Sequence, residues 1–481
     1  MSVFVDAIEG PPGAAARWSG IDWSTAHRHV SRLQTRIVKA IKAGQWHRAR
    51  SLQRLLANSF YAKLLAVERV SSNRGARTPG VDGVVLKTPQ SKWQQAQRLG
   101  AKDYKPQPLR RSYIPKKNGK RRPLGIPTQA DRAEQALELL ALNPVAECLA
   151  DTGSYGFRKE RSVHDAIARC FLSLSSQCRA EWILEGDIRG CFDHLSHEWM
   201  VEHVPTHREK LRAWLKAGFM ERGVFHPTEA GTPQGGIISP TAASMALDRL
   251  ESCLRQFNAH KVHLVRYADD FIITGARRAL LVDEVKPRVV QFLKERGLEL
   301  SEEKTRIVRI DEGFDFLGFN LRKYHGKLLI KPTPNSIAAV KEKARVTFKA
   351  GISLPQGLLI HRLNPVLRGW AYFYRHVVSK QVFGDIDSAI WRMTWNCARR
   401  RHPRKRSKWI KDRYYTSNGG RNWVFTDGEA ELFRMSSLPI RRHLLIRGEA
   451  NPYDPDWAEY FRRRSIRPGP LPMEHPEWDL V

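Results

Sequence analysis

The sequence predicts an α+β protein of several domains, and three observations support this prediction. Its 481 residues are more than one compact core usually holds, which indicates two to four domains. Short strand patterns alternate with helical patterns between about residues 106 and 330. On both sides of this mixed stretch the pattern is helical instead.

The N-terminal part, from about Trp23 to Val70, is predicted to be helical. Lysines and arginines occupy the positions between its apolar residues, and a loop rich in glycine, proline and asparagine follows, SSNRGARTPGVDG (Ser71–Gly83). This basic loop is either a flexible connector or a segment that approaches a phosphate backbone. The apolar residues recur at three- and four-residue steps: Val30, Leu33, Ile37, Ile41, Leu52, Leu55 and Leu56.

The mixed centre begins with RRSYIPKKNGKRRPLGIP, which predicts two strands joined by a turn at Asn118-Gly119. A strand at Trp182–Leu184 then leads to Asp187, and a helix follows. Further on, an amphipathic helix ends near Gly297 and a strand comes after it. GFDFLGFNL and GKLLIKP predict another pair of strands.

The stretch HLVRYADDFIITG (His263–Gly275) has two adjacent carboxylates between two strand patterns. Both halves are rich in β-branched and aromatic residues, which favours a tight hairpin with Asp269 and Asp270 at its tip. Such a dipeptide is either an ordinary acidic turn or a pair of oxygen ligands aimed at a hard cation. The dipeptide by itself leaves both interpretations open.

Beyond Pro334 the chain is predicted to be helical, aromatic and strongly basic. Between Arg392 and Arg413, ten residues are lysine or arginine and one, Asp412, is acidic. Such a run is often only a solvated face, but here it alternates with aromatic rings, which favours contact with RNA or DNA. The rings are Trp391, Trp395, Trp409, Tyr414 and Tyr415, and the candidate nucleic-acid contacts are Arg399, Arg400, Arg401, Arg404, Lys405 and Arg406.

The overall charge agrees with a polyanionic partner. The formal net charge is +32, which would attract nucleic acid from a distance. No apolar run approaches the roughly 20 residues of a membrane span, and the N-terminus has no secretory pattern. None of the six cysteines is in a C-x-x-C pair, so neither a zinc knuckle nor a disulfide framework is indicated. We therefore expect a cytoplasmic protein with free thiols and no membrane partner.

Asp187 is the natural partner of Asp269 and Asp270, because it also follows an apolar strand. Carboxylates from separate strand ends can hold two Mg²⁺ ions roughly 3.5–4 Å apart, the arrangement that catalyses phosphoryl transfer. A glycine-rich loop, GTPQGGIISP (Gly231–Pro240), could let backbone approach a base pair. A triphosphate could be gripped by the cations of the first hairpin, Lys116, Lys117, Lys120, Arg121 and Arg122.

Seven stretches of the chain resemble, in order and spacing, the successive blocks of the reverse transcriptases encoded by bacterial group II introns. They are RPLGIPTQADRAEQALELL, SYGFRKERSVHDAI, LEGDIRGCFDHLSH, GTPQGGIISP, RYADDF, GLELSEEKTRI and FDFLGF. The resemblance extends to both flanks. IDWSTAHRHVSRLQTRI and NRGARTPGVDG resemble the N-terminal extension of that family, LNPVLRGWAYFYRH its maturase or thumb domain, and PIRRHLLIRGEANPYDPDWAEYFRRR the stretch after the thumb.

The resemblance implies a right-hand fold of fingers and palm, with a helical extension before it and a helical thumb after it. The implied divisions are residues 1–95 for the extension, 96–330 for fingers and palm, 331–415 for the thumb, and 416–481 for a basic, DNA-binding region. The implied activity is RNA-directed DNA synthesis, with binding of a structured intron RNA to assist its splicing. The implied partners are that RNA, an RNA template, a DNA primer or target, and dNTPs.

The resemblance also assigns site residues. Asp187, Asp269 and Asp270 correspond to the catalytic triad that binds two Mg²⁺ ions. Phe192 corresponds to the ring that rejects a ribose 2′-hydroxyl, and Gln234 to a glutamine near the incoming nucleotide. Lys116 and Arg122 correspond to the fingers residues that contact its triphosphate.

Two departures from the family pattern stand out. Thr241–Ser244 reads TAAS where members often have L-L-A-N, for which we expect altered packing and intact chemistry. The C-terminal stretch SIRPGPLPMEHPEWDLV lacks the paired cysteines of an HNH endonuclease, so we expect no cutting of a second DNA strand. Two alternatives stay open: a reverse transcriptase used by its host for repair or phage defence, and an RNA-binding maturase whose polymerase is dispensable.

Overall fold

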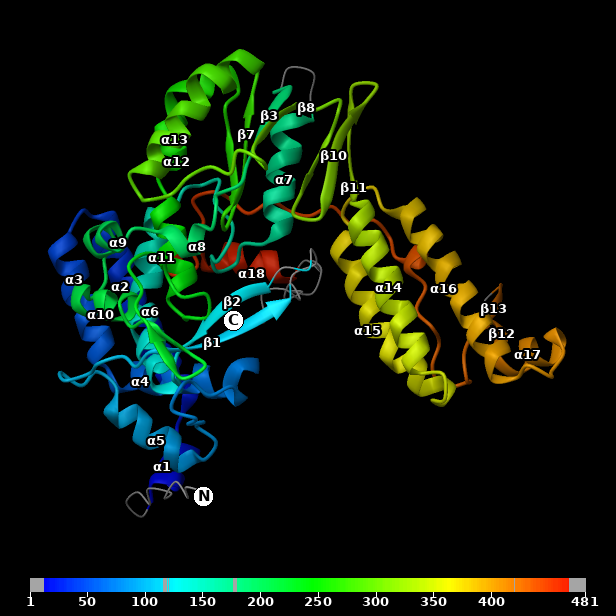
Figure 1. The fold of residues 1–481 in the computed structure, drawn as a ribbon, viewed down its shortest axis with the longest axis horizontal. Coiled ribbons are helices and arrows are strands. Elements are labelled where there is room, and N and C mark those ends of the chain that lie inside the picture. Colours follow the sequence, from blue (N-terminus) through cyan, green and yellow to red (C-terminus); the bar gives the residue numbers. More distant parts are fainter. Residues whose placement is uncertain (1–12, 116–118, 120, 176–179, 419, 467–481) are drawn as a thin grey trace.

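The computed structural model describes residues 13–115, 119, 121–175, 180–418 and 420–466. The N-terminal helices and a small sheet lie at one end of the molecule, and the helices of residues 334–414 lie at the other (Figure 1). A second four-stranded sheet, which contains β3 (Trp182–Gly186) and β7 (Asp270–Gly275), lies at the top of this view (Figure 1).

The N-terminal region is helical, as predicted, but it divides into three helices. Helix α2 (Trp23–Lys42) begins where the side chain of Asp22 accepts a hydrogen bond from the backbone N–H of Thr25. It is followed by α3 (Trp46–Asn58) and α4 (Phe60–Ser72). Most of the predicted apolar positions are buried, but Leu55 of α3 is 52% exposed. The short helices α1 (Ala14–Ser19), α5 (Pro89–Arg98) and the 3₁₀ turn η1 (Arg74–Arg77) complete this region.

The basic loop Ser71–Gly83 is fixed in place by a buried side chain. The guanidinium of Arg132 donates to the carbonyl of Gly75 at 3.1 Å and to that of Thr78. Arg132 is only 6% exposed and belongs to helix α6 (Gln129–Leu149). The loop is therefore anchored to the adjacent helix, which argues against a flexible connector.

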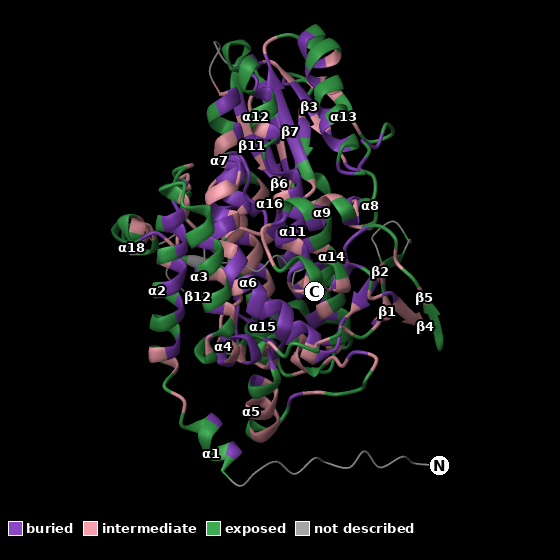
Figure 2. Cartoon of the chain, turned by 90° about the vertical axis from the view of Figure 1, so that its left-hand side faces the viewer, coloured by how far each residue is buried: buried purple, intermediate pink, exposed green. Residues whose placement is uncertain are grey.

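The first sheet has the strand order β2-β1-β4-β5. Strands β1 (Leu109–Pro115) and β2 (Arg121–Ile126) pair antiparallel, which confirms the predicted hairpin up to its turn. Most of that turn lies outside the described residues. Strands β4 (Phe219–Glu221) and β5 (Val224–His226) extend the sheet, and β5 forms its largely exposed edge (Figure 2).

The second sheet has the strand order β6-β7-β3-β8 and carries the candidate acids. Its strands are β3 (Trp182–Gly186), β6 (Leu264–Tyr267), β7 (Asp270–Gly275) and β8 (Arg306–Arg309). Strand β7 is buried along most of its length (Figure 2). The surrounding elements are α7 (Val163–Leu174), α8 (Cys191–His194), α9 (His197–His203), α10 (Arg208–Leu215), α11 (Ser239–Leu247), α12 (Leu250–Leu254), η2 (Arg255–His260), the π-helical η3 (Leu280–Val285) and α13 (Lys286–Lys294).

The remaining chain forms a third sheet and a helical body. The sheet order β11-β10-β9 contains the strand pair predicted from GFDFLGFNL and GKLLIKP. The helices predicted beyond Pro334 are confirmed, and a short hairpin, β12 with β13, follows them. The elements are β9 (Phe314–Phe316), β10 (Phe319–Tyr324), β11 (Lys327–Pro332), α14 (Pro334–Ala350), α15 (Gln356–Tyr374), α16 (Lys380–Arg401), α17 (Ser407–Tyr414), β12 (Tyr415–Asn418) and β13 (Arg421–Phe425).

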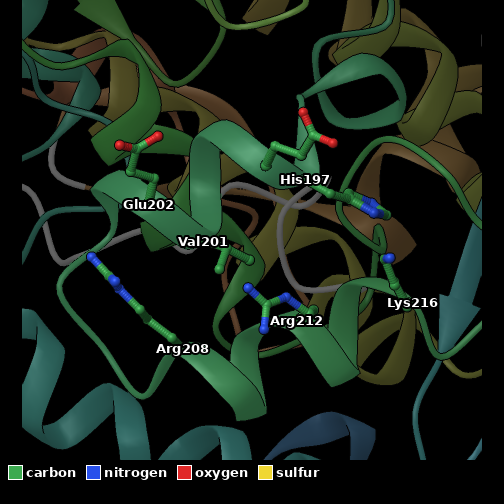
Figure 3. A pocket seen from close by; sticks show the side chains of 7 residues that line it. His197, Val201, Glu202, Arg208, Arg212 and Lys216 are labelled. Atoms are coloured by element: carbon green, nitrogen blue, oxygen red, sulfur yellow. The ribbon is translucent and has the colours of Figure 1, made fainter.

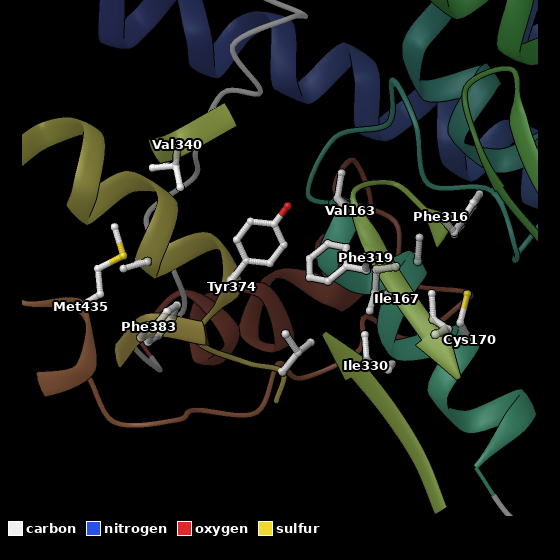
Figure 4. Close-up of a cluster of buried hydrophobic side chains, with 14 of the residues drawn as sticks. Val163, Ile167, Cys170, Phe316, Phe319, Ile330, Val340, Tyr374, Phe383 and Met435 are labelled. Atoms are coloured by element: carbon white, nitrogen blue, oxygen red, sulfur yellow. The ribbon is translucent and has the colours of Figure 1, made fainter. Parts of the chain in front are cut away.

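One hydrophobic core joins this helical body to the second sheet. Ile167 of α7, Phe319 of β10, Tyr374 of α15 and Phe383 of α16 belong to the same buried cluster (Figure 4). Ile183 of β3 and Ile272 of β7 also belong to this cluster, so the helical body packs directly against the second sheet.

The C-terminal chain crosses back over the molecule. It includes η4 (Met435–Ser437), η5 (Pro455–Trp457) and α18 (Ala458–Ile466). Asp165 of α7 accepts hydrogen bonds from the backbone N–H of Ile446 at 2.8 Å and from Arg464 at 2.7 Å. Further along, Asp454 pairs with Lys42 of α2. The segment thus connects the N-terminal helices to the rest of the chain.

Across the described residues, we find no helix that is both long and apolar enough to span a membrane.

Candidate functional site

Asp269 and Asp270 lie on a tight hairpin, as predicted. We call β6, β7 and their turn (Leu264–Gly275) the acid hairpin. Tyr267 pairs with Asp270, so the turn has only two residues, Ala268 and Asp269. Asp270 is therefore the first residue of β7 and not part of the tip, where the sequence predicted both acids to lie. Ala268 adopts a left-handed backbone, φ +58°, as a two-residue hairpin turn requires.

Asp187 lies at the same end of the second sheet as these two acids. Strand β3 is the neighbour of β7, and Gly186 pairs with Phe271, so the next residue, Asp187, follows directly beside Asp270. The backbone of Asp187 is held on its other side, where its carbonyl accepts a hydrogen bond from Ser301 at 2.7 Å. The three acids that the sequence singled out thus come together at one end of two neighbouring strands.

The charges of these acids oppose one another. Burial raises the pKa of Asp269, and the nearby charge of Asp187 raises it further. Burial, followed by the charges of Asp269 and Asp187, raises the pKa of Asp270 to about 7. The protein therefore assembles carboxylates whose ionised forms are only partly compensated by nearby cations, an arrangement characteristic of functional sites.

Lys304 is a site residue that the sequence did not single out. Its Nζ lies 3.0 Å from Oδ2 of Asp187, and its charge lowers the pKa of both hairpin acids against the larger effect of burial. It lies within the quoted stretch GLELSEEKTRI, so the motif contained it. Its contact with an acid 117 positions earlier could not be found from local patterns.

The donor set fits a hard divalent cation. Among the described residues no group of three His, Cys, Asp or Glu side chains is arranged to hold a single metal ion, and Asp187 is paired with Lys304. However, carboxylate oxygens are the ligands that Mg²⁺ prefers, and a cation bound to Asp269 and Asp270 would offset the repulsion that raises the pKa of each.

The glycine-rich loop packs directly on the helix that follows Asp187. The backbone N–H of Thr232 donates to the carbonyl of Phe192 at 2.6 Å. Gly231 has φ +84°, and a Cβ there would lie 2.6 Å from that same carbonyl oxygen. Only glycine fits this close approach. Phe192 is half-buried and meets Phe157 edge to face at 6.3 Å between ring centroids.

The same loop brings Gln234 close to two other elements. The side-chain amide of Gln234 donates to Asp193 at 3.2 Å, and its backbone carbonyl accepts a hydrogen bond from Gly125 of β2 at 2.9 Å. The loop therefore spans from the first sheet to α8. Phe192 and Gln234, which were predicted from separate motifs, are brought into one neighbourhood by these contacts.

The predicted triphosphate contacts differ in what the structure describes. Arg122 is exposed on β2, and its charge lowers the pKa of Asp269 and of Asp270. It is thus close enough to the acids to act on them electrostatically. Lys116 lies outside the described residues.

A buried ion pair supports the acid hairpin. Arg266 of β6 is fully buried, and its Nη2 lies 2.5 Å from Oδ1 of Asp248. Its Nη1 donates to the carbonyl of Ala268 at 3.2 Å, and its guanidinium also reaches Ser244. Ser244 belongs to the variant TAAS stretch, so this stretch contacts the arginine that supports the acid hairpin. An arginine inside the apolar strand LVRY was the only local signal of this pair.

A cavity of about 430 Å³ lies between α9 and α10, apart from the acids (Figure 3). Arg208, Arg212 and Lys216 line one side of it, opposite Glu202 of α9. His197, on its wall, donates from Nε2 to the carbonyl of Gly231 at 2.7 Å. This contact makes His197 a support of the glycine-rich loop.

The predicted nucleic-acid contacts lie at the end of α16 and in the turn after it. Arg399, Arg400, Arg404, Lys405 and Arg406 are exposed. Arg401 is half-buried instead, and its Nη2 donates to the carbonyl of Gly351 at 2.9 Å. The aromatic residues also divide: Trp391 and Trp409 are 39% and 38% exposed, whereas Tyr414 and Tyr415 are buried in a small core. Tyr414 and Tyr415 are therefore packing residues, and among the five rings Trp391 and Trp409 are the most exposed.

Three family models match successive parts of the chain. Residues 18–99 match the N-terminal domain of reverse transcriptase. Residues 114–321 match the reverse transcriptase, or RNA-dependent DNA polymerase, itself. Residues 337–415 match the group II intron maturase-specific domain.

The chain is also similar to individual proteins. The chain is 35% identical over 324 residues to Protein YkfC of Escherichia coli K12, covering 57% of this chain and 83% of YkfC. It is 30% identical over 328 residues to the group II intron-encoded protein LtrA of Lactococcus lactis subsp. cremoris, covering 54% of each chain. Among solved structures it is similar to telomerase from Candida albicans, with a TM-score of 0.37, 14% identity, and coverage of 66% of this chain and 65% of that one. A likeness this weak carries no argument.

Proposed function

The chain belongs to the reverse transcriptases encoded by group II introns, RNA-directed DNA polymerases that also assist splicing, and we propose that Asp187, Asp269 and Asp270 are its catalytic centre. The observation that carries this proposal is the meeting of these three carboxylates at one sheet edge. The raised pKa of Asp269 and of Asp270 supports it. A bound cation would stabilise the ionised carboxylates against the desolvation and mutual repulsion that raise these pKa values.

The three aspartates would hold two Mg²⁺ ions. When bound, such ions supply Lewis acidity, which favours an ionised primer hydroxyl and neutralises the leaving pyrophosphate. The protein's own part is to fix the carboxylates on a rigid sheet and to bring the reactants together. Lys304, paired with Asp187, adds a positive charge beside this centre.

We propose that the surrounding loops bind and select the dNTP. Arg122 of β2 would contact the triphosphate through the N–H groups of its guanidinium, and Lys116 would contact it as a point charge. Gln234 would lie against the nucleotide, positioned by its hydrogen bond to Asp193. Phe192 would close off the space that a 2′-hydroxyl needs, because its backbone is fixed by Thr232 and its ring by Phe157.

The experiment that tests the centre is the substitution Asp269→Asn. It removes one ligand charge and keeps nearly the same shape, so extension of a DNA primer on an RNA template should fall by orders of magnitude. The matched control is Asp283→Asn, the same change at an exposed acid of η3. Synthesis by Asp269→Asn at the level of Asp283→Asn would refute the assignment.

We propose that the structured intron RNA binds the helical body of residues 331–415, which we assign as the thumb. Its exposed arginines and lysines would contact phosphates, and the catalytic groups for splicing would belong to the RNA. The same proposal assigns residues 1–95 to an N-terminal extension, 96–330 to fingers and palm, and 416–481 to DNA binding. The free thiols of the five described cysteines favour a reducing, cytoplasmic setting.

A further inference from the structure

A cavity of about 480 Å³ opens between the middle of α16, strand β13 and residues 432–434. Trp391 of α16, Trp423 of β13 and Phe433 line it, and Arg392 and Arg434 stand among them. Its volume lies within the roughly 300–1,000 Å³ that binding pockets for small ligands occupy. It lies between the thumb and the segment that follows the thumb, and none of its lining residues belongs to the acid hairpin or to the glycine-rich loop.

The aromatic wall of this cavity is rigid and still accessible. Trp391 is 39% exposed. Behind it lies Trp395, whose ring is nearly parallel at 6° with centroids 6.3 Å apart, and Trp423 meets Trp391 edge to face at 5.8 Å. An indole held by other rings and open to solvent is a preformed stacking surface for a planar ligand.

The backbone of Trp423 is unusual for so large a residue. Its φ of +62° lies in the left-handed region, which non-glycine residues with bulky side chains rarely adopt. Such conformations persist where the surrounding structure fixes them, and they gather at ligand sites. Here the conformation places the indole of Trp423 beside Trp391 on the cavity wall.

The charge around the cavity favours an anionic ligand. Within the described part of the chain, no carboxylate lies within 4.0 Å of the Arg392 guanidinium. Asp387 also lines the cavity, but its negative charge is partly offset. Its two carboxylate oxygens accept hydrogen bonds from the backbone N–H groups of Met435 and Ser436, each at 2.9 Å. Arg434 lies 3.9 Å from Asp387 and donates to Ser436 at 2.9 Å, so its guanidinium is positioned at the rim.

We propose that this cavity binds one unstacked nucleobase of an RNA, with the base against Trp391 and Trp423 and the adjoining phosphates at Arg392 and Arg434. An aromatic hollow with a cationic rim matches a base attached to a charged backbone. Structured RNAs expose such bases at bulges and loops, whereas a fully paired helix does not. The inference rests on the proposed function only in that the thumb meets RNA, and it adds the position and the kind of nucleotide recognised.

The test uses the full-length protein and two RNA hairpins, one fully paired and one with a single bulged 5-iodouridine. Irradiation should crosslink the bulged base to a peptide that contains Trp391 or Trp423. Trp391→Ala should weaken binding of the bulged hairpin by roughly five- to hundredfold, the range of one base–aromatic stack, and leave the paired hairpin unaffected. Trp391→Phe should restore most of the affinity, because it restores a ring.

The matched control is Trp46→Ala, a tryptophan of α3 that is similarly exposed at 41%. Primer extension on poly(rA)/oligo(dT) by each variant reports whether the fold is kept, and Arg392→Gln is a second variant that leaves the rings intact. Crosslinks only at other peptides, or equal loss for both hairpins, would overturn the nucleobase site and leave the RNA-binding thumb standing. Failure of the wild-type protein to bind either hairpin would overturn the RNA partner as well.

Discussion

The acid hairpin and the cationic end of the thumb differ in how their charges are distributed: they are concentrated in the first region and dispersed in the second. In the hairpin and beside it, like charges are collected at one end of the central strands β7 and β3, where desolvation and mutual repulsion raise the pKa of Asp269 and of Asp270. Between Arg399 and Arg406 the charges are spread over exposed positions of a helix end and a turn. Concentrated charge suits the binding of a small, doubly charged ion, and dispersed charge suits a long polyanion. The comparison distinguishes the proposed catalytic centre from the proposed nucleic-acid-binding surface.

The largest effect should come from removing the buried support of the hairpin. Arg266→Met leaves Asp248 without its partner in the interior, and breaking such a pair costs about 3–5 kcal/mol. It also frees the carbonyl of Ala268 in the turn. We expect a lower unfolding temperature and a strong loss of primer extension. Arg309→Met, which removes a half-exposed partner of Glu181 on β8, should cost no more than about 1 kcal/mol, and equal losses would contradict a special role for the buried pair.

The opposite manipulation neutralises the dispersed charge. Changing Arg399, Arg400, Arg404, Lys405 and Arg406 to glutamine removes five exposed cations. Each lost phosphate contact should flatten the log–log dependence of RNA affinity on salt by about 0.7, so the slope should change by up to about 3.5. Synthesis on poly(rA)/oligo(dT) at low salt should survive, because the acid hairpin is untouched.

Arg401→Gln is the matched variant for that experiment. Its guanidinium bonds to Gly351 and lies 6.0 Å from the Tyr414 ring, so we expect a lower unfolding temperature with little change in salt slope. A slope change from Arg401→Gln equal to that of the five exposed residues would erase the distinction between packing and binding arginines.

The junction between the two regions should respond to acid. Burial, followed by the neighbouring His443, lowers the pKa of His164 to about 4. Burial, followed by His164 and His443, lowers that of His376 to about 2. Both values lie below the roughly 6.5 of an unfolded chain, so the unfolded state takes up protons first and stability falls as pH drops below that value.

At pH 5.5 the expected loss is about 1.4 kcal/mol for each of these histidines relative to pH 8. His164 lies on α7, and His376 lies two residues after the end of α15, so the loss would loosen the contact of thumb and palm. Thermal unfolding between pH 8 and pH 5.5 measures it. The double variant His164→Gln/His376→Gln should have a flatter pH profile, and an unchanged profile would show that other groups set the acid sensitivity.

The smallest expected effect concerns sugar selection near the acids. Phe192→Ala should raise incorporation of ribonucleotides relative to deoxynucleotides by roughly tenfold, the change that about 1.4 kcal/mol of lost discrimination produces. Phe171→Ala, at a phenylalanine of α7 that is 44% exposed, controls for loss of a ring. A ratio in Phe192→Ala that matches the control would make Phe192 a packing residue only.

Local patterns were sufficient for the elements that depend on neighbouring residues. The acid hairpin, the β1–β2 pair and the helices beyond Pro334 all form where their residue patterns predicted them. Helix boundaries were harder to predict from the sequence. A turn after α2 interrupts the helix although the apolar pattern continues, and Leu55, which belongs to that pattern, is exposed. Periodicity describes one face of a helix and does not report what that face meets.

The sequence by itself predicted three acids at the ends of strands, because strand and turn preferences act over a few residues. Its resemblance to a known family gave the order of the blocks around them. Only the tertiary structure decided which charges are paired and which rings are open. Lys304 reaches Asp187 across 117 positions, and Arg401 is drawn into packing while its neighbours are not. Tyr414 is buried, whereas Trp391 stays exposed at a cavity. Burial and ion pairing depend on what the rest of the chain brings to each residue, which no local stretch contains.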